Sequence, residues 1–185
     1  MNLDLLEGAV LSKGKHYKGP ETCALELIHL VVTGEKDDSV PECLSETLSI
    51  LPILNDGPWR DDAHRTSVLL PYLRRLLDCP KDEEVDQRRV FALADYAVRK
   101  IAQVNCPLVV DEESALQASK LAGFAAEERG EEISYWASQV AKWAPDWVGQ
   151  SAEWAGWATR QDEQESADVF ESHARALLEI ICETK

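Results

Sequence analysis

Five residues in the first quarter of the chain have side chains that bind metals or take part in acid–base and nucleophilic chemistry: His16, Cys23, Glu26, Glu35 and Cys43. Cys23 and Glu26 stand three positions apart in a helical pattern, so they share one face of the helix. A structural zinc ion takes four ligands, most often Cys and His. The segment offers His16, Cys23 and Cys43, with a nearby carboxylate or His29 as the fourth ligand. Because no C-x-x-C pair is present, the spacing leaves zinc as one hypothesis among several.

Two other interpretations fit the same residues. In a small thiol enzyme, His16 or His29 would activate Cys23 as the nucleophile, but the pattern supplies no obvious oxyanion hole or orienting acid. In a structural role, Cys23 lies in the core, His16 caps a backbone group and Glu26 pairs with a lysine. Both site hypotheses predict that His16, Cys23 and Cys43 lie close together in the fold, because turns flank the helix between them.

Helical patterns run along the first half of the chain, separated by loops marked with Gly and Pro. Pro20 fits the first position of one helix, and Gly34 fits its C-terminal cap. Pro52 should kink the next helix, and Pro71 should divide the one that Asp61 or Asp62 caps. The expected helices cover residues 2–7, 22–33, 45–55 and 61–79.

The second half has longer patterns and no convincing pair of alternating strands. Its expected helices cover residues 82–104, 112–129, 131–144, 145–160 and 162–183. Asp95 and Arg99 lie one turn apart on the first of these and can form a buried pair. We therefore expect an all-α fold, an irregular helical bundle with kinked N-terminal helices and longer C-terminal helices. The expected division is an N-terminal domain over 1–107, which holds the His/Cys/Glu cluster, and an Ala/Trp-rich region over 108–185 packed on it.

Tryptophan is concentrated in one segment of the second region. Its spacing forms a stripe on a helix, which predicts either a packing seam or an exposed face for a partner, with Trp136 and Trp143 as binding residues. The last helix has a matching apolar stripe, so the two should pack as an antiparallel pair or bury each other in a homodimer. The two stripes are Trp136, Trp143, Trp147, Trp154 and Trp157, and Phe170, Ala174, Leu177 and Ile181.

The chain is strongly acidic, with 34 Asp and Glu against 19 Lys and Arg and a formal net charge of −15. Such a surface repels phosphates, which argues against direct nucleic-acid binding. The excess charge serves either solubility or recognition of a basic protein, including a nucleic-acid-binding protein whose DNA channel the carboxylates would occupy. The candidate binding carboxylates are Glu127, Glu128, Glu131 and Glu132.

Other features narrow the class of protein. No G-x-G-x-x-G or G-x-x-x-x-G-K-[ST] motif is present, which argues against a nucleotide-dependent enzyme. No apolar run approaches the ~20 residues that span a bilayer, and the N-terminus lacks the basic segment of a secretory signal. We therefore expect a cytoplasmic protein with no membrane partner, whose five scattered cysteines are free thiols.

The run SKGKHYKGPETCALELIHLVVTGE, followed by VPEC and ILND, resembles an uncharacterised family of actinobacteria and their phages. The resemblance covers about residues 12–105, and it departs where the family usually has Asp and this chain has Ser39. It implies a phage or prophage setting and marks the polar cluster as a family feature, but it supplies no reaction. The matching positions are His16, Cys23 with Glu26, Gly34 with Glu35, Pro41 with Cys43, and Leu54-Asn55-Asp56.

Together these patterns favour a non-catalytic protein-interaction module, a phage-encoded acidic factor that binds a host protein. The alternative is a small metal-dependent or thiol enzyme that uses His16, Cys23, Glu26 and Cys43.

Overall fold

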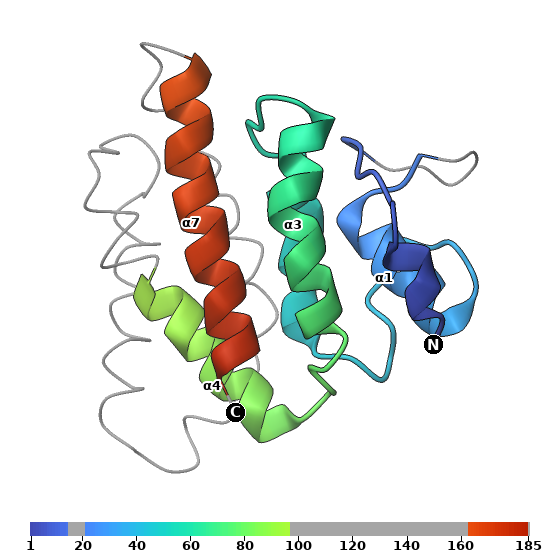
Figure 1. Ribbon diagram of the computed structural model, residues 1–185. Helices are drawn as coiled ribbons and strands as arrows, with labels where there is room; N and C mark the ends of the chain where they lie inside the picture. The colour runs from blue at the N-terminus through green and yellow to red at the C-terminus, as the bar shows by residue number, and fades with distance from the viewer. Residues whose placement is uncertain (15–20, 97–162, 185) are drawn as a thin grey trace.

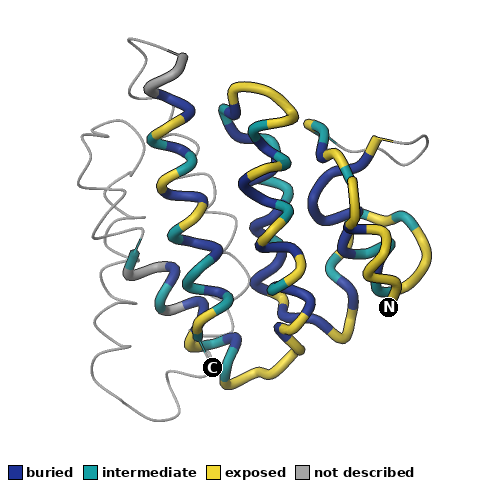
Figure 2. Tube along the Cα trace, viewed as in Figure 1, coloured by how far each residue is buried: buried dark blue, intermediate teal, exposed yellow. Residues whose placement is uncertain are grey.

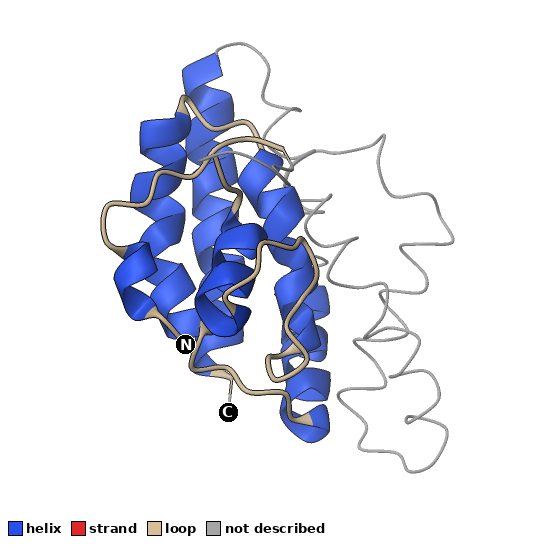
Figure 3. Cartoon of the chain, turned by 90° about the vertical axis from the view of Figure 1, so that its right-hand side faces the viewer, coloured by secondary structure: helices blue, strands red, loops and turns tan. Residues whose placement is uncertain are grey.

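The computed structural model of the protein describes residues 1–14, 21–96 and 163–184. These residues form helices and loops without a sheet, which confirms the expected all-α fold (Figure 3). Two isolated β-bridges occur among them, between Leu11 and Thr22 and between Leu44 and Pro80. The helical elements are η1 (Leu3–Leu6), α1 (Ala24–Thr33), η2 (Glu46–Ile50), α2 (Leu51–Asp56), α3 (Asp62–Leu76), α4 (Glu83–Tyr96) and α7 (Glu163–Glu183).

Helix α3 stands at the centre of the described structure (Figure 1). It packs against α7 on one side and against α1 on the other, while α4 contacts α7 near the C-terminus of the chain. The short helices η2 and α2 contact each other, and α2 also packs on α1. The N-terminal element η1 is tied to α1 by a hydrogen bond from the Asn2 N–H to the Val31 carbonyl at 2.7 Å.

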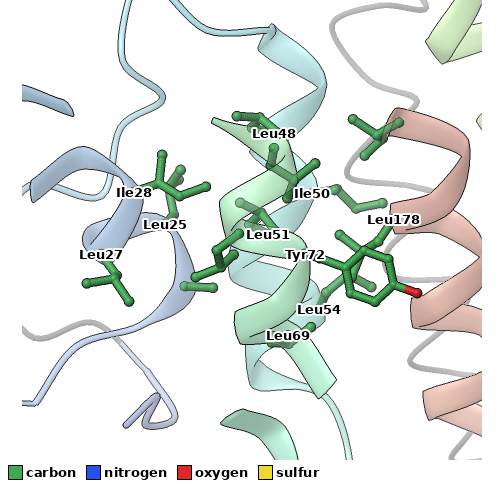
Figure 4. Packing of buried hydrophobic residues seen from close by; sticks show 14 of the residues in the cluster. Leu25, Leu27, Ile28, Leu48, Ile50, Leu51, Leu54, Leu69, Tyr72 and Leu178 are labelled. Atoms are coloured by element: carbon green, nitrogen blue, oxygen red, sulfur yellow. The ribbon is translucent and has the colours of Figure 1, made fainter. Parts of the chain in front are cut away.

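The core is built mainly from buried leucines of the described helices. Figure 2 shows how buried positions alternate with exposed ones along these helices. Figure 4 shows Leu25 and Ile28 of α1 on one side of this core and Leu178 of α7 on the other, with Tyr72 of α3 between the layers. The predicted stripe of α7 is confirmed, because its four members are fully buried. These members are Phe170, Ala174, Leu177 and Ile181. Within the described part of the chain, α7 packs against α3 and α4, whereas the expected tryptophan partner stripe lies outside it.

Local capping signals set several helix ends as predicted. Gly34 ends α1 with φ +85°, a left-handed conformation that glycine adopts without steric cost. Asp61 caps α3, since its side chain accepts a hydrogen bond from the His64 N–H. Ser45 caps η2 in the same way through the Thr47 N–H at 3.3 Å. One start is corrected: α1 begins at Ala24 with Cys23 as its N-cap, so Pro20 is not its first residue.

The two internal prolines act differently from the prediction. Pro52 falls in the first turn of α2, where a missing N–H has no intrahelical partner to lose. The helix expected over residues 45–55 is instead irregular where the 3-10 turn η2 passes into α2. The expected division at Pro71 is wrong, because α3 continues through it from Asp62 to Leu76. Pro71 and Ser67 are exposed, so water can satisfy the Ser67 carbonyl that loses its helical donor.

The later helices agree with the sequence where the structure describes them. Helix α4 begins at Glu83, directly after Asp82, whose carboxylate accepts a hydrogen bond from the Val85 N–H at 2.9 Å. Helix α7 matches the predicted range of 162–183 to within one residue at its start. The expected helices over 112–129, 131–144 and 145–160, and the domain boundary after residue 107, lie outside the described residues. No helix in the described part is both long and apolar enough to cross a bilayer.

Candidate functional site

Cys23 and Glu26 form a capping box at the start of α1. The Cys23 N–H donates to Glu26 Oε2 at 2.9 Å, and the Glu26 N–H donates to Cys23 Sγ at 3.5 Å. Both residues are buried, with exposed fractions of 2% and 0%. The pair therefore satisfies two backbone donors that would otherwise be unpaired at a buried helix end.

Burial also suppresses the reactivity of this thiol. Removal from water, with the adjacent Glu26 carboxylate adding to it, raises the pKa of Cys23 to about 11. Cys23 is therefore a neutral thiol near pH 7, a poor nucleophile and a poor metal ligand without deprotonation. His29, which the thiol-enzyme hypothesis places beside Cys23, instead contacts the Ser39 carbonyl oxygen through Nδ1 at 3.1 Å.

The end of α2 ties the start of α1 to the N-terminal loop. Asn55 Oδ1 accepts from the Ala24 N–H at 3.1 Å, and Asn55 Nδ2 donates to the Ser12 carbonyl at 2.8 Å. Next to it, Asp56 Oδ1 accepts from the Gly14 N–H at 2.8 Å. The Leu54-Asn55-Asp56 segment is therefore the last turn of α2, and its polar side chains fix two other segments.

Arg65 completes this network from α3. It is 4% exposed, and its Nε donates to the Asn55 carbonyl at 2.6 Å, while an Nη donates to the Leu11 carbonyl at 3.4 Å. Asp62, one turn earlier on the helix, pairs with the same guanidinium. Arg65 is not among the residues that the sequence patterns predicted for this site. A signal was present, because Arg65 begins the same apolar stripe of α3 that continues through Leu69, Tyr72 and Leu76.

The sequence-predicted metal ligands are only partly described. Cys23 is the buried cap of α1, whereas Cys43 is exposed and its carbonyl accepts from the Lys81 N–H at 3.0 Å. His16 lies outside the described residues. Among the residues that the structure describes, no three His, Cys, Asp or Glu side chains form a group that could hold a metal ion. A zinc site that includes His16 stays a prediction.

A second buried polar network joins α4, η2 and α7. Asp86 accepts from Ser45 Oγ at 2.5 Å and from an Nη of Arg89 at 2.8 Å. Arg89 also donates through Nε to the Ile181 carbonyl near the end of α7 at 3.0 Å. The side chains of Asp86 and Arg89 are 13% and 5% exposed. The sequence placed a buried pair on this helix at Asp95 and Arg99, whose side chains lie outside the described residues.

An exposed acidic surface lies where two loops meet. The Leu44–Pro80 bridge and the Lys81 N–H bond to Cys43 hold residues 42–46 beside residues 78–84. Six exposed carboxylates occupy these two segments, and the one base among them, Lys81, pairs with Glu46 at 2.5 Å. We call this set the acidic loop surface: Glu42, Glu46, Asp78, Asp82, Glu83 and Glu84.

The other predicted binding residues fall outside the described part of the chain. They are Glu127, Glu128, Glu131, Glu132, Trp136 and Trp143. The expected homodimer through the Trp/Ala helices concerns the same segment and stays a prediction.

In comparisons with known proteins, no family model, no curated protein and no solved structure matches this chain. The resemblance to the actinobacterial and phage family therefore stays a prediction, and the function is argued from the residues.

The capping role of Cys23 predicts a specific pair of results. Cys23→Ala should lower the free energy of unfolding by about 1 kcal/mol or more, because the Glu26 N–H loses its acceptor. Cys23→Ser should stay within about 0.5 kcal/mol of the natural protein, because Ser caps helices well and can donate to Glu26 as the thiol does. Urea unfolding with and without a chelator measures both. If Cys23→Ser loses as much stability as Cys23→Ala and the chelator destabilises the natural protein, Cys23 is a metal ligand.

Proposed function

We propose that this protein is a non-catalytic interaction module of the cytoplasm that binds a basic partner protein through its acidic loop surface. In the phage setting that the resemblance implies, the partner is a host protein that itself binds nucleic acid. The observation that carries the proposal is the clustering of six exposed carboxylates on two segments, residues 42–46 and 78–84, which are joined at the Leu44–Pro80 bridge.

Helix capping does not account for the whole of this surface. Asp82, Glu83 and Glu84 lie at the start of α4, where the helix dipole favours acids. Asp78 follows the C-terminal end of α3, where the dipole disfavours a negative charge. Glu42 belongs to the loop before η2, outside any helix. A concentration of negative charge that helix stability does not require supports a role in recognition.

The N-terminal polar cluster also favours binding over catalysis. Cys23 and Glu26 cap the first turn of α1, and Asn55 and Arg65 bond to backbone groups of neighbouring segments. Such contacts hold loops rigidly in place, and a rigid surface loses less entropy when it binds a partner. The alternative enzyme, which would use His16, Cys23, Glu26 and Cys43 with zinc or a free thiolate, requires Cys23 to abandon its cap.

A charge-reversal experiment tests the proposal with a matched control. Glu83→Lys with Glu84→Lys changes the acidic loop surface, whereas Asp4→Lys with Glu7→Lys makes the same change in net charge on exposed residues near the N-terminus. Tagged forms of the full chain are used to capture partners from lysate of the host cells at ~50 mM and ~300 mM salt. The captured protein is identified, purified and titrated with each form, and then with duplex DNA as competitor.

We expect a basic DNA-binding protein whose affinity falls about 10-fold or more with the loop-surface variant and about 2-fold or less with the N-terminal variant, with DNA competing. Equal losses in the two variants would mean that net charge alone attracts the partner. Capture of no basic protein, or of one that the loop-surface variant binds equally well, would contradict the proposal.

A further inference from the structure

Cys79 and Cys182 are more than a hundred positions apart in the sequence and lie close together where the α3–α4 linker contacts the end of α7. Cys79 lies in the linker between α3 and α4 and is 3% exposed, and Cys182 lies in the last turn of α7, partly exposed. Cys79 Sγ lies 3.9 Å from the carbonyl oxygen of Ile181, the residue that precedes Cys182, so the two cysteines are neighbours in the fold. Neither is used by the polar cluster or by the acidic loop surface described above.

Contacts on both sides of Cys182 hold it in this position. Arg75 of α3 pairs with Glu179 at 2.8 Å and with Glu183 at 2.6 Å. Arg89 of α4 donates to the carbonyl of Ile181, the residue that precedes Cys182. The end of α7 is thus fixed to α3 and α4 by groups that flank Cys182, which keeps this part of the helix beside the linker that carries Cys79.

The surroundings shift the pKa values of the two thiols in opposite directions. The hydrogen bond from Cys182, helped by the positive charge of Arg89, lowers the pKa of Cys79 to about 7, despite burial and the opposing charges of Asp78 and Asp86. The same hydrogen bond raises the pKa of Cys182. Of the two thiols, Cys79 is therefore the more easily ionised, and Cys182 is the one that keeps its proton near neutral pH, which is the arrangement of an attacking thiolate beside a resolving thiol.

We propose that Cys79 and Cys182 are a reversible oxidation site, which a peroxide converts into a disulfide that joins α7 to the α3–α4 linker. The Cys79 thiolate attacks one peroxide oxygen, the O–O bond breaks and hydroxide leaves, giving a sulfenic acid on Cys79. The Cys182 sulfur then attacks the Cys79 sulfur and displaces its hydroxyl, while the Cys182 proton completes a water molecule. In total, two thiols and one hydrogen peroxide give one disulfide and two waters.

The remaining cysteines differ from this pair. Cys23 is buried as the cap of α1, with a raised pKa, and Cys43 is exposed. Cys106 lies outside the described residues. Cleavage after Lys and Arg places these cysteines in different peptides, so a peptide map can tell them apart. The peptides are 76–81 with Cys79, 176–185 with Cys182, 37–60 with Cys43 and 101–120 with Cys106.

The test treats the reduced full chain with a small excess of hydrogen peroxide and then alkylates the remaining thiols. We expect two of the five thiols to be lost, peptides 76–81 and 176–185 to be joined, and dithiothreitol to restore both thiols. The oxidised protein should also melt about 5 °C or more higher than the reduced protein, because the new bond closes a long loop in the unfolded chain.

Variants assign the two roles. Cys43→Ser should behave as the natural protein does, whereas Cys182→Ser should form no joined peptide and should leave a sulfenic acid on Cys79 that dimedone traps. The peptide map is made on the natural protein, so the test does not depend on whether a variant such as Cys79→Ser folds. The proposal is overturned if both Cys79 and Cys182 stay open to alkylation after peroxide, or if the joined peptides contain any other cysteine.

Discussion

Replacing Asp86 with alanine is expected to lower the free energy of unfolding by about 3–5 kcal/mol. Asp86 pairs with Arg89 at 2.8 Å, and the Arg89 side chain is only 5% exposed. Without the carboxylate, the guanidinium keeps its charge in a site where water cannot replace the lost partner. Ser45 Oγ, which donates to Asp86 at 2.5 Å, loses an acceptor at the same time. The loss would be measured as a shift of the urea midpoint at constant slope.

A matched control separates burial from helix electrostatics. Glu84→Ala removes an acid from the first turn of the same helix, where the side chain is exposed, and should change stability by about 0.5 kcal/mol or less. If Asp86→Ala also costs less than about 1 kcal/mol, Asp86 and Arg89 are hydrated in solution, and α4 does not pack against η2 and α7 as described.

The second large effect is expected at Gly57, where α2 ends. Its backbone, with φ −60° and ψ 178°, is open to any residue, so alanine causes no conformational strain there. A Cβ at this position would overlap the ring of Phe170 on α7. That ring is fully buried and packs edge-on against Trp59, with centroids 4.9 Å apart, so it has little room to move. Gly57→Ala should therefore cost about 2–3 kcal/mol, through overpacking alone.

A double-mutant cycle identifies the cause of that loss. Phe170→Leu shortens the side chain that meets Gly57 and by itself leaves a partly filled space. In the double variant, the new methyl group occupies part of that space, so the combined loss should be smaller than the sum of the single losses by about 1 kcal/mol or more. Thermal or urea unfolding of the four proteins gives the comparison. Strictly additive losses would show that Gly57 and Phe170 are not in contact.

Features governed by neighbours along the chain could be predicted from the sequence. Gly34, Ser45 and Asp61 mark helix ends because each acts on backbone groups within one turn. The buried stripe of α7 follows from a spacing of three and four residues, which repeats on one face of any helix. The all-α class follows from the same local patterns.

The candidate site contains contacts that patterns of neighbouring residues along the chain could not predict. The spacing of Cys23 and Glu26 correctly predicted that they share a face, and it is also the spacing of a capping box with Cys in place of Ser. Only the surrounding structure decides between a cap and a ligand, because that choice depends on burial and on which donors lie within reach. Asn55 of α2 and Arg65 of α3, which hold the start of α1 in place, come from elsewhere in the chain and had no local signature of that role.

What the sequence alone determined is therefore that these segments are helical and which face the last helix buries, since helix periodicity and capping act over three or four residues. What only the tertiary structure decided is which polar groups meet. Helix α3 runs through Pro71 because packing on both sides outweighs one lost hydrogen bond. Asp86 accepts a hydrogen bond from Ser45, and Cys79 contacts the Ile181 carbonyl of α7, because the packing of α4 and α7 buries Asp86, Ser45 and Cys79. Such pairings depend on distances between elements, which periodicity along one helix does not encode.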